Sequence, residues 1–161
     1  MELKNVREKS HRLSSNFYKG ETRVTFTLCV KDKENLFTSY SVVNKFIEYL
    51  DKAMRKYDCK NWAYIFMPNH AHIVLEGNSI DADLWKTIVC FKQKTGFWLL
   101  KNNLSFRWQK DFYDYIHRAD NDLKKHIVYI LGNPVRKGLV SNWEDYPFKG
   151  SLNYKLEDIV N

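Results

Sequence analysis

Apolar positions change their period several times along the chain, and each change marks a new element. Residues 23–30 are rich in β-branched and aromatic side chains and predict a first strand. From residue 39 to about 57 the apolar residues recur at helical spacing, which predicts a helix. Residues 61–67 and 70–75, separated by a Pro-Asn pair, predict two strands joined by a tight turn.

The second half of the chain continues this alternation. Residues 80–101 predict a second helix, and the mixed aromatic and charged stretch 108–118 predicts a fourth strand. Residues 120–132 predict a third helix, capped by Asp120 and stopped by Asn133 before proline. Strand, helix, strand, strand, helix, strand is the ferredoxin-like (split βαβ) order, so we expect an α+β fold: an antiparallel sheet with two helices on one face. The third helix, which we expect to be a C-terminal helix that carries Tyr129, is then a candidate to cover the other face.

Length and composition fit one domain. The 161 residues are 44% apolar and include 5 Trp, 10 Tyr and 10 Phe, enough to bury a core and to exclude disorder of the whole chain. We expect a basic arm over residues 1–17, a domain over 18–151 and a tail over 152–161. No apolar run reaches the roughly 18 residues that span a bilayer, and no signal-peptide segment is seen, so we expect a cytoplasmic protein.

The net charge indicates the class of binding partner, and the cysteine content bears on disulfide bonds and zinc sites. Twenty-six Lys and Arg against 19 Asp and Glu leave a net charge of +7, which favours a polyanionic partner. Cys29, Cys59 and Cys90 are odd in number and lack CxxC spacing. We expect them to be buried, reduced thiols and not a disulfide framework or a zinc site.

Two histidines stand out on the predicted strand 70–75. Side chains alternate across a strand, so His70 and His72 point to one face and the intervening apolar residues to the other. Two neighbouring imidazoles suit a divalent metal ion. The same spacing also fits two polar residues on the solvent side of an amphipathic strand, and the spacing alone leaves both readings open.

The predicted third helix carries a tyrosine on a polar stripe. At about 100° per residue, four polar side chains lie within roughly 60° of one another: Asp122, His126, Tyr129 and Asn133. Its apolar side chains lie on the opposite side: Leu123, Ile127, Ile130 and Leu131. This pattern fits a nucleophilic tyrosine, and equally a border tyrosine followed by an ordinary helix stop.

Three segments in this order carry a family resemblance: Met67-Pro-Asn-His-Ala-His-Ile-Val-Leu75, Tyr129-Ile-Leu-Gly-Asn-Pro-Val-Arg-Lys-Gly-Leu-Val140 and Trp143-Glu-Asp-Tyr-Pro-Phe148. Together they resemble the REP-associated tyrosine transposases, single-tyrosine members of the HUH (histidine-hydrophobic-histidine) nuclease superfamily. The resemblance runs from about Arg12 to Ser151. It departs from the family at residues 149–151, Lys-Gly-Ser, where relatives have paired serines.

The resemblance implies an enzyme that cuts and rejoins single-stranded DNA at hairpin-forming palindromic repeats. In it, His70 and His72 bind a divalent ion, Tyr129 is the catalytic nucleophile, and Asn133 falls where relatives place a third polar metal ligand. The implied product is a 5′-phosphotyrosine with a free 3′-hydroxyl. Magnesium or manganese is the expected cofactor, because phosphate and water oxygens must complete its shell. No membrane or protein partner is expected.

Single-stranded DNA also requires a basic groove with stacking surfaces. The residues expected to line it are Arg12, Lys92, Lys94, Arg107, Lys125, Arg136 and Lys137. Two other functions remain open: a DNA-binding module of the same fold without turnover, and a metal hydrolase in which Tyr129 only positions substrate. The complete set of His70, His72 and Tyr129 favours the transposase.

Overall fold

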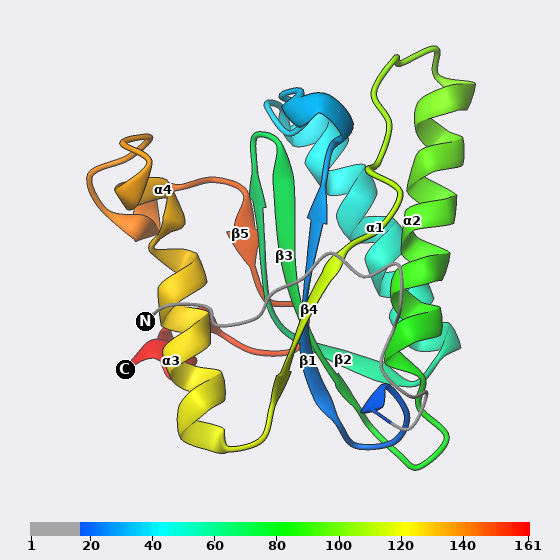
Figure 1. The fold of residues 1–161 in the computed structure, drawn as a ribbon. Coiled ribbons are helices and arrows are strands. Elements are labelled where there is room, and N and C mark those ends of the chain that lie inside the picture. The colour runs from blue at the N-terminus through cyan, green and yellow to red at the C-terminus, as the bar shows by residue number, and fades with distance from the viewer. Residues whose placement is uncertain (1–16) are drawn as a thin grey trace.

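Five antiparallel strands form one sheet in the order β4-β1-β3-β2-β5 in the computed structural model, which describes residues 17–161 (Figure 1). The strands are β1 (Arg23–Cys29), β2 (Cys59–Met67), β3 (His70–Gly77), β4 (Tyr113–His117) and β5 (Lys149–Gly150). Arg12 and residues 1–16 of the predicted arm lie outside the described residues.

Helices cover both faces of this sheet. They are α1 (Tyr40–Lys56), α2 (Leu84–Lys101), α3 (Asp120–Leu131), α4 (Asn133–Arg136) and α5 (Leu156–Val160), with short 3-10 turns η2 (Lys31–Lys33) and η3 (Trp143–Asp145). Helices α1 and α2 lie together on one face, and α3 lies on the other (Figure 1). The predicted α+β, ferredoxin-like arrangement is confirmed. No helix among the described residues is long and apolar enough to cross a membrane.

The larger core lies under α1 and α2. Alternate residues of β1 and β3 point into it, as the period-two pattern predicts: Val24, Phe26, Leu28, Ala71, Ile73 and Leu75. Phe46 of α1 packs edge-on against Phe37, Phe66 and Phe91. Each fully buried ring of this kind contributes about 1.5–3 kcal/mol, so this side of the sheet fixes the scaffold.

A smaller core lies on the opposite face, under α3. The sheet contributes Ala63, Ile65, Met67 and Val74 to this core. They pack against the apolar stripe that the sequence assigns to this helix: Leu123, Ile127, Ile130 and Leu131. Tyr146 and Leu156 from the last segment of the chain join this core. The apolar stripe therefore holds α3 across the face of the sheet to which His70 and His72 belong.

The start of α3 differs from the sequence prediction. The N-cap residue is Ala119, and Asp120, the predicted cap, is the first helical residue. Its carboxylate pairs with the guanidinium of Arg23 on β1. The Asp120 side chain thus ties the first turn of α3 to the sheet instead of capping the helix.

The end of α3 also differs. Gly132 keeps a near-helical backbone, with φ −78° and ψ −9°, and Asn133 begins α4 with Pro134 in its first turn. Proline is tolerated there because the first amide of a helix has no intrahelical acceptor. The helix that carries Tyr129 is therefore followed by α4 and α5 and is not the C-terminal helix of the chain.

Other boundaries shift for local reasons. Helix α2 begins at Leu84, since Asp83 caps it by accepting a hydrogen bond from the amide of Lys86 at 2.9 Å. Strand β4 is shorter than predicted, and Trp108 makes only an isolated bridge to Val30. Strand β5 has two residues, too few for a periodic pattern. No disulfide joins the three cysteines, of which only Cys59 is buried.

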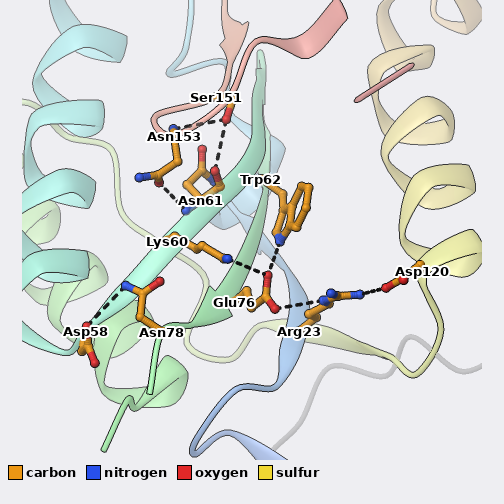
Figure 2. A network of polar contacts seen from close by, with 10 residues as sticks. All are labelled: Arg23, Asp58, Lys60, Asn61, Trp62, Glu76, Asn78, Asp120, Ser151 and Asn153. Carbon is orange, nitrogen blue, oxygen red and sulfur yellow. Dashed lines mark hydrogen bonds and ion pairs between the residues drawn. The ribbon is translucent and has the colours of Figure 1, made fainter. Parts of the chain in front are cut away.

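Asn61 fastens the last segment of the chain to the sheet, as Figure 2 shows. It is fully buried beside an irregularity in the β2–β3 register. Its side-chain amide donates to the carbonyls of Ala63 and Val74 at 2.9 and 3.0 Å, and its Oδ1 accepts from the amide of Leu152 at 3.1 Å. Its backbone amide donates to Asn153 Oδ1 at 2.7 Å.

We expect Asn61→Ala to lower the free energy of unfolding by about 3 kcal/mol, since this buried side chain loses three hydrogen bonds worth roughly 1 kcal/mol each. Urea unfolding followed by circular dichroism measures this change. Asn78→Ala is the matched control, because that exposed amide makes a single 3.3 Å hydrogen bond to Asp58 and should change stability by no more than about 0.5 kcal/mol. Equal effects of the two substitutions would contradict the assignment.

Candidate active site

The paired histidines lie on β3, which is flanked by β1 and β2. The ring centroids of His70 and His72 are 5.0 Å apart, with ring planes at 85°. Ala71 and Ile73 point into the larger core on the other face, as predicted. His72 is only 8% exposed, so the pair does not form an ordinary solvent-facing edge of an amphipathic strand.

Hydrogen bonds hold one nitrogen of each ring. Nδ1 of His70 lies 2.7 Å from Oδ1 of Asn69, and Nδ1 of His72 lies 2.8 Å from Oγ1 of Thr27. An amide oxygen only accepts, which assigns the His70 proton to Nδ1 and leaves the lone pair on Nε2. Among residues 17–161 neither Nε2 has a hydrogen-bond partner, and neither belongs to the fully buried, unpartnered atoms. Both Nε2 atoms are therefore free to bind a ligand.

Both imidazoles are neutral at neutral pH. Burial lowers the pKa of His70 to about 4, and the charge of Lys137 adds to this effect. Burial also lowers the pKa of His72 well below its usual range, with smaller contributions from His70, His126 and Arg136. Neutral imidazole is the form that binds metal ions, so no proton has to leave before binding.

Tyr129 is half-buried near the end of α3 and lies against an arginine. The guanidinium carbon of Arg136 is 4.0 Å from the centroid of the Tyr129 ring. Nη2 of Arg136 donates to the Tyr129 carbonyl at 2.6 Å and also to Oδ1 of Asn133. Arg136 thus clamps α4 to the last turn of α3. Within the described residues, the Tyr129 hydroxyl makes no hydrogen bond, and the Tyr129 ring forms no ring pair with His70 or His72.

Helix α4 provides the link between the tyrosine helix and the histidines. Arg136 and Lys137 are near enough to lower the pKa values of His72 and His70 respectively. The structure therefore brings the charged end of α4 within electrostatic range of the two histidines, while Tyr129 also lines a groove on the outer side of α3. That the Tyr129 hydroxyl lies at the same site as the imidazoles of His70 and His72 stays a prediction.

His126 is the residue that sequence reasoning misplaced. It falls on the predicted polar stripe, yet it is only 2% exposed, and neither of its ring nitrogens has a hydrogen-bond partner in the part of the chain that the structure describes. Its ring stacks on Tyr115 at 5.2 Å and 5°, and it meets the edge of His117 at 4.7 Å. Burial lowers its pKa to about 4. The helical period placed it correctly relative to Tyr129, but no sequence signal showed that β4 covers this side of α3.

The donor set fits a divalent ion. Among the described residues, no three side chains of His, Cys, Asp or Glu come together as a metal site. Two neutral imidazole nitrogens without a protein partner, with the carboxamide of Asn133 as the predicted third donor, suit Mn²⁺, whose remaining ligands are oxygens. In the structure Oδ1 of Asn133 accepts from Arg136, so ligation by Asn133 requires Arg136 to release it.

The basic residues fall into two groups. Lys125, Arg136 and Lys137 are exposed on α3 and at the end of α4, on the histidine side of the sheet. Lys92 and Lys94 are on α2, which covers the other face, and Arg107 is in the loop that follows. Nζ of Lys92 donates to the carbonyls of Gln109 and Lys110 at 2.9 and 3.1 Å. These residues therefore do not all lie on one face of the sheet.

We expect Thr27→Val to weaken Mn²⁺ binding about 10–100-fold, because the partner that fixes the ring of His72 is lost. Calorimetric titration of the purified protein measures the affinity. Thr25→Val is a matched control on the same strand, since Oγ1 of Thr25 bonds His117 Nε2 at 2.7 Å instead. Unchanged affinity in Thr27→Val, or an equal loss in both variants, would contradict the role of Thr27.

Comparison with known proteins assigns the class. The chain belongs to the IS200-like transposase family, whose family model matches residues 19–130, more than two thirds of the chain and a range that includes His70, His72 and Tyr129. It is therefore an enzyme of the tyrosine transposase class, as the resemblance predicted.

Within this class the chain is similar to REP-associated tyrosine transposases. The Escherichia coli K12 protein of that name is 30% identical over 128 residues, which cover 76% of this chain and 72% of that protein. A Haemophilus influenzae protein provisionally given the same name is 27% identical over 135 residues, 76% of each chain. A solved REP-associated tyrosine transposase, bound to a REP hairpin, matches with a TM-score of 0.71 at 23% identity over 89% of this chain and 82% of that chain, which supports the fold.

Proposed function

We propose that this transposase is a metal-dependent single-stranded DNA endonuclease and strand transferase that acts on hairpin-forming repeat DNA through Tyr129. The observation that carries the proposal is the pair of neutral imidazoles on β3, of which His72 is buried and His70 is half-buried. Each has Nδ1 in a hydrogen bond and Nε2 without a partner among the described residues, and both feel the charges at the end of α4.

The reaction exchanges one phosphoester bond for another. The Tyr129 hydroxyl loses its proton, its oxygen forms a bond to the scissile phosphorus, and the bond from phosphorus to the 3′-oxygen breaks. The departing oxygen takes up a proton and leaves as a 3′-hydroxyl. Because the number of phosphoester bonds is unchanged, attack by another 3′-hydroxyl on the phosphotyrosine rejoins DNA without ATP.

His70, His72 and Asn133 would hold the divalent ion, magnesium or manganese. When bound, the ion polarises a non-bridging phosphate oxygen and orients the phosphate. Arg136 contacts both Tyr129 and Asn133, so its release from Asn133 would couple ligand binding at the site to freedom of the tyrosine. Its guanidinium would then be available to a phosphate, which it matches in geometry.

Hairpin DNA is the proposed partner. The chain carries a net charge of +7, and Lys125, Arg136 and Lys137 are exposed next to the site. A polyanion is attracted by such a surface in a salt-dependent manner. The hairpin-bound relative supports the same class of ligand for this chain.

The test is incubation of the protein with a labelled oligonucleotide that carries a hairpin and a single-stranded flank, with Mn²⁺ or with EDTA. We expect a protein–DNA adduct on a denaturing gel only with the metal ion. Cleavage with turnover and no adduct would indicate a metal hydrolase. Hairpin binding without cleavage across a panel of repeat sequences would indicate a binding module.

A further inference from the structure

A groove of about 740 Å³ lies on the outer side of α3. Helix α3, helix α4, the turn η3 and the last residues of the chain line it. Its apolar lining residues are Val128, Leu131, Val135 and Val160. Two of them remain notably exposed, Val128 at 46% and Val135 at 39%. Its volume is in the range of about 300–1,000 Å³ of sites for small organic groups.

Aromatic and charged side chains complete the lining. Tyr129 and Trp143 contribute rings, and Lys125 and Arg136 contribute cations. Glu144 adds a carboxylate, which accepts hydrogen bonds from the amino groups of a base and repels phosphate. The groove therefore combines an apolar and aromatic interior with cations that suit the phosphates on either side of a base.

We propose that this groove binds a nucleobase of the single strand that Tyr129 cleaves, turned out of the base stack. The proposal rests on the proposed function, because Tyr129 is both the nucleophile and a residue lining the groove. A phosphate that reaches the Tyr129 hydroxyl must place a neighbouring nucleoside beside α3. Stacking on aromatic side chains is the usual way proteins hold an unpaired base.

Charge argues for DNA over another copy of this chain. The chain carries a net charge of +7, and two copies would bring like charges together at Lys125 and Arg136. A DNA strand brings phosphates to these same cations. The groove also shares Tyr129 and Arg136, whose side chains are in contact, with the proposed active site.

The test replaces one nucleotide at a time in the single-stranded flank by an abasic residue. Binding to Tyr129→Phe protein is measured by fluorescence anisotropy, so that cleavage does not interfere. We expect one position at which loss of the base weakens binding about tenfold, equal to about 1.4 kcal/mol and within the range of base–aromatic stacking. Introducing Trp143→Ala into the Tyr129→Phe protein should weaken binding of the intact oligonucleotide by a similar factor. It should also remove the loss of affinity caused by the abasic residue at that position.

Two further variants serve as controls. One tests the groove independently in case Trp143→Ala does not fold, and the other tests whether loss of any exposed aromatic ring has the same effect. Val128→Glu changes an exposed residue of the groove and places a carboxylate where the base would lie, so it should also weaken binding about tenfold and suppress the abasic penalty. Tyr40→Ala removes an exposed aromatic ring at the start of α1, outside the groove, and should leave both quantities unchanged.

The groove assignment would be overturned if no abasic position weakened binding, that is, if the scan were flat. It would also be overturned if the loss of affinity from the abasic residue added fully to the loss from Trp143→Ala or Val128→Glu. Adduct formation by the unmodified protein is scored separately with the intact oligonucleotide. An adduct with a flat scan leaves the proposed function standing without the groove. If one abasic position weakens binding in a groove-dependent way but no adduct forms, the nucleobase site stands and the proposed nuclease function fails.

Discussion

Tyr129→Phe is expected to abolish the covalent protein–DNA adduct and to reduce strand cleavage by at least roughly 10³-fold. The substitution removes only the attacking oxygen. The ring stays in contact with Arg136, whose guanidinium lies 4.0 Å from its centroid, and the Tyr129 hydroxyl makes no hydrogen bond within the described residues. Affinity for the hairpin should therefore remain within about twofold, since phosphate contacts dominate it.

Two measurements check this expectation: a denaturing gel for the adduct, and anisotropy for the affinity. Tyr40→Phe is the matched control, because Tyr40 is exposed at the first residue of α1, a helix on the opposite face of the sheet from α3. It should form the adduct normally. Cleavage at the normal rate by Tyr129→Phe would show that another group, or water, attacks the phosphate.

His72→Ala should remove both metal binding and metal-dependent cleavage. The ring is held at Nδ1 by Thr27 and offers Nε2, so its loss removes one of two protein nitrogens. A metal ion contributes several kcal/mol to stabilising the charge that develops on a phosphate, and cleavage should fall by at least roughly 10²-fold. The increase in Tm that Mn²⁺ gives the unmodified protein should disappear.

The melting temperature separates a lost ligand from a damaged fold. Without added metal, His72→Ala should melt cooperatively, and His72→Gln, which keeps more of the side-chain volume, should behave likewise. Thr25→Val should keep its Mn²⁺-dependent increase in Tm, because Thr25 bonds His117. Normal cleavage, or an intact increase in Tm, in both His72 variants would end the proposal that His72 is a metal ligand.

The scaffold of the site could be predicted because each strand and helix carries its own period. In β3, alternation alone assigns His70 and His72 to one face and Ala71 and Ile73 to the other, and the structure agrees. In α3, the apolar stripe that includes Ile127 and Ile130 packs on the sheet as predicted. Such patterns depend only on backbone geometry, so they do not require knowledge of the partner element.

Contacts between elements could not be predicted in this way. The burial of His126 depends on β4, whose residues Tyr115 and His117 meet it from a different part of the chain. The clamp of Arg136 on Tyr129 and Asn133 depends on Gly132, which keeps the backbone near-helical where proline suggested a stop. A proline only disfavours a helical backbone at the residue before it, and the packing of the following turn decides whether the helical path ends there.

The sequence by itself determined the order of the elements, the faces to which His70 and His72 point, and the family to which the chain belongs. The tertiary structure decided that both imidazoles are neutral with Nε2 unpartnered among the described residues, and that the charged end of α4 lies within electrostatic range of them. It also decided that α3, α4, η3 and the end of the chain line a groove that includes Tyr129. The physical reason is that desolvation, pKa shifts and cavities arise from atoms of several segments at once, whereas periodicity reports the orientation of side chains within one segment.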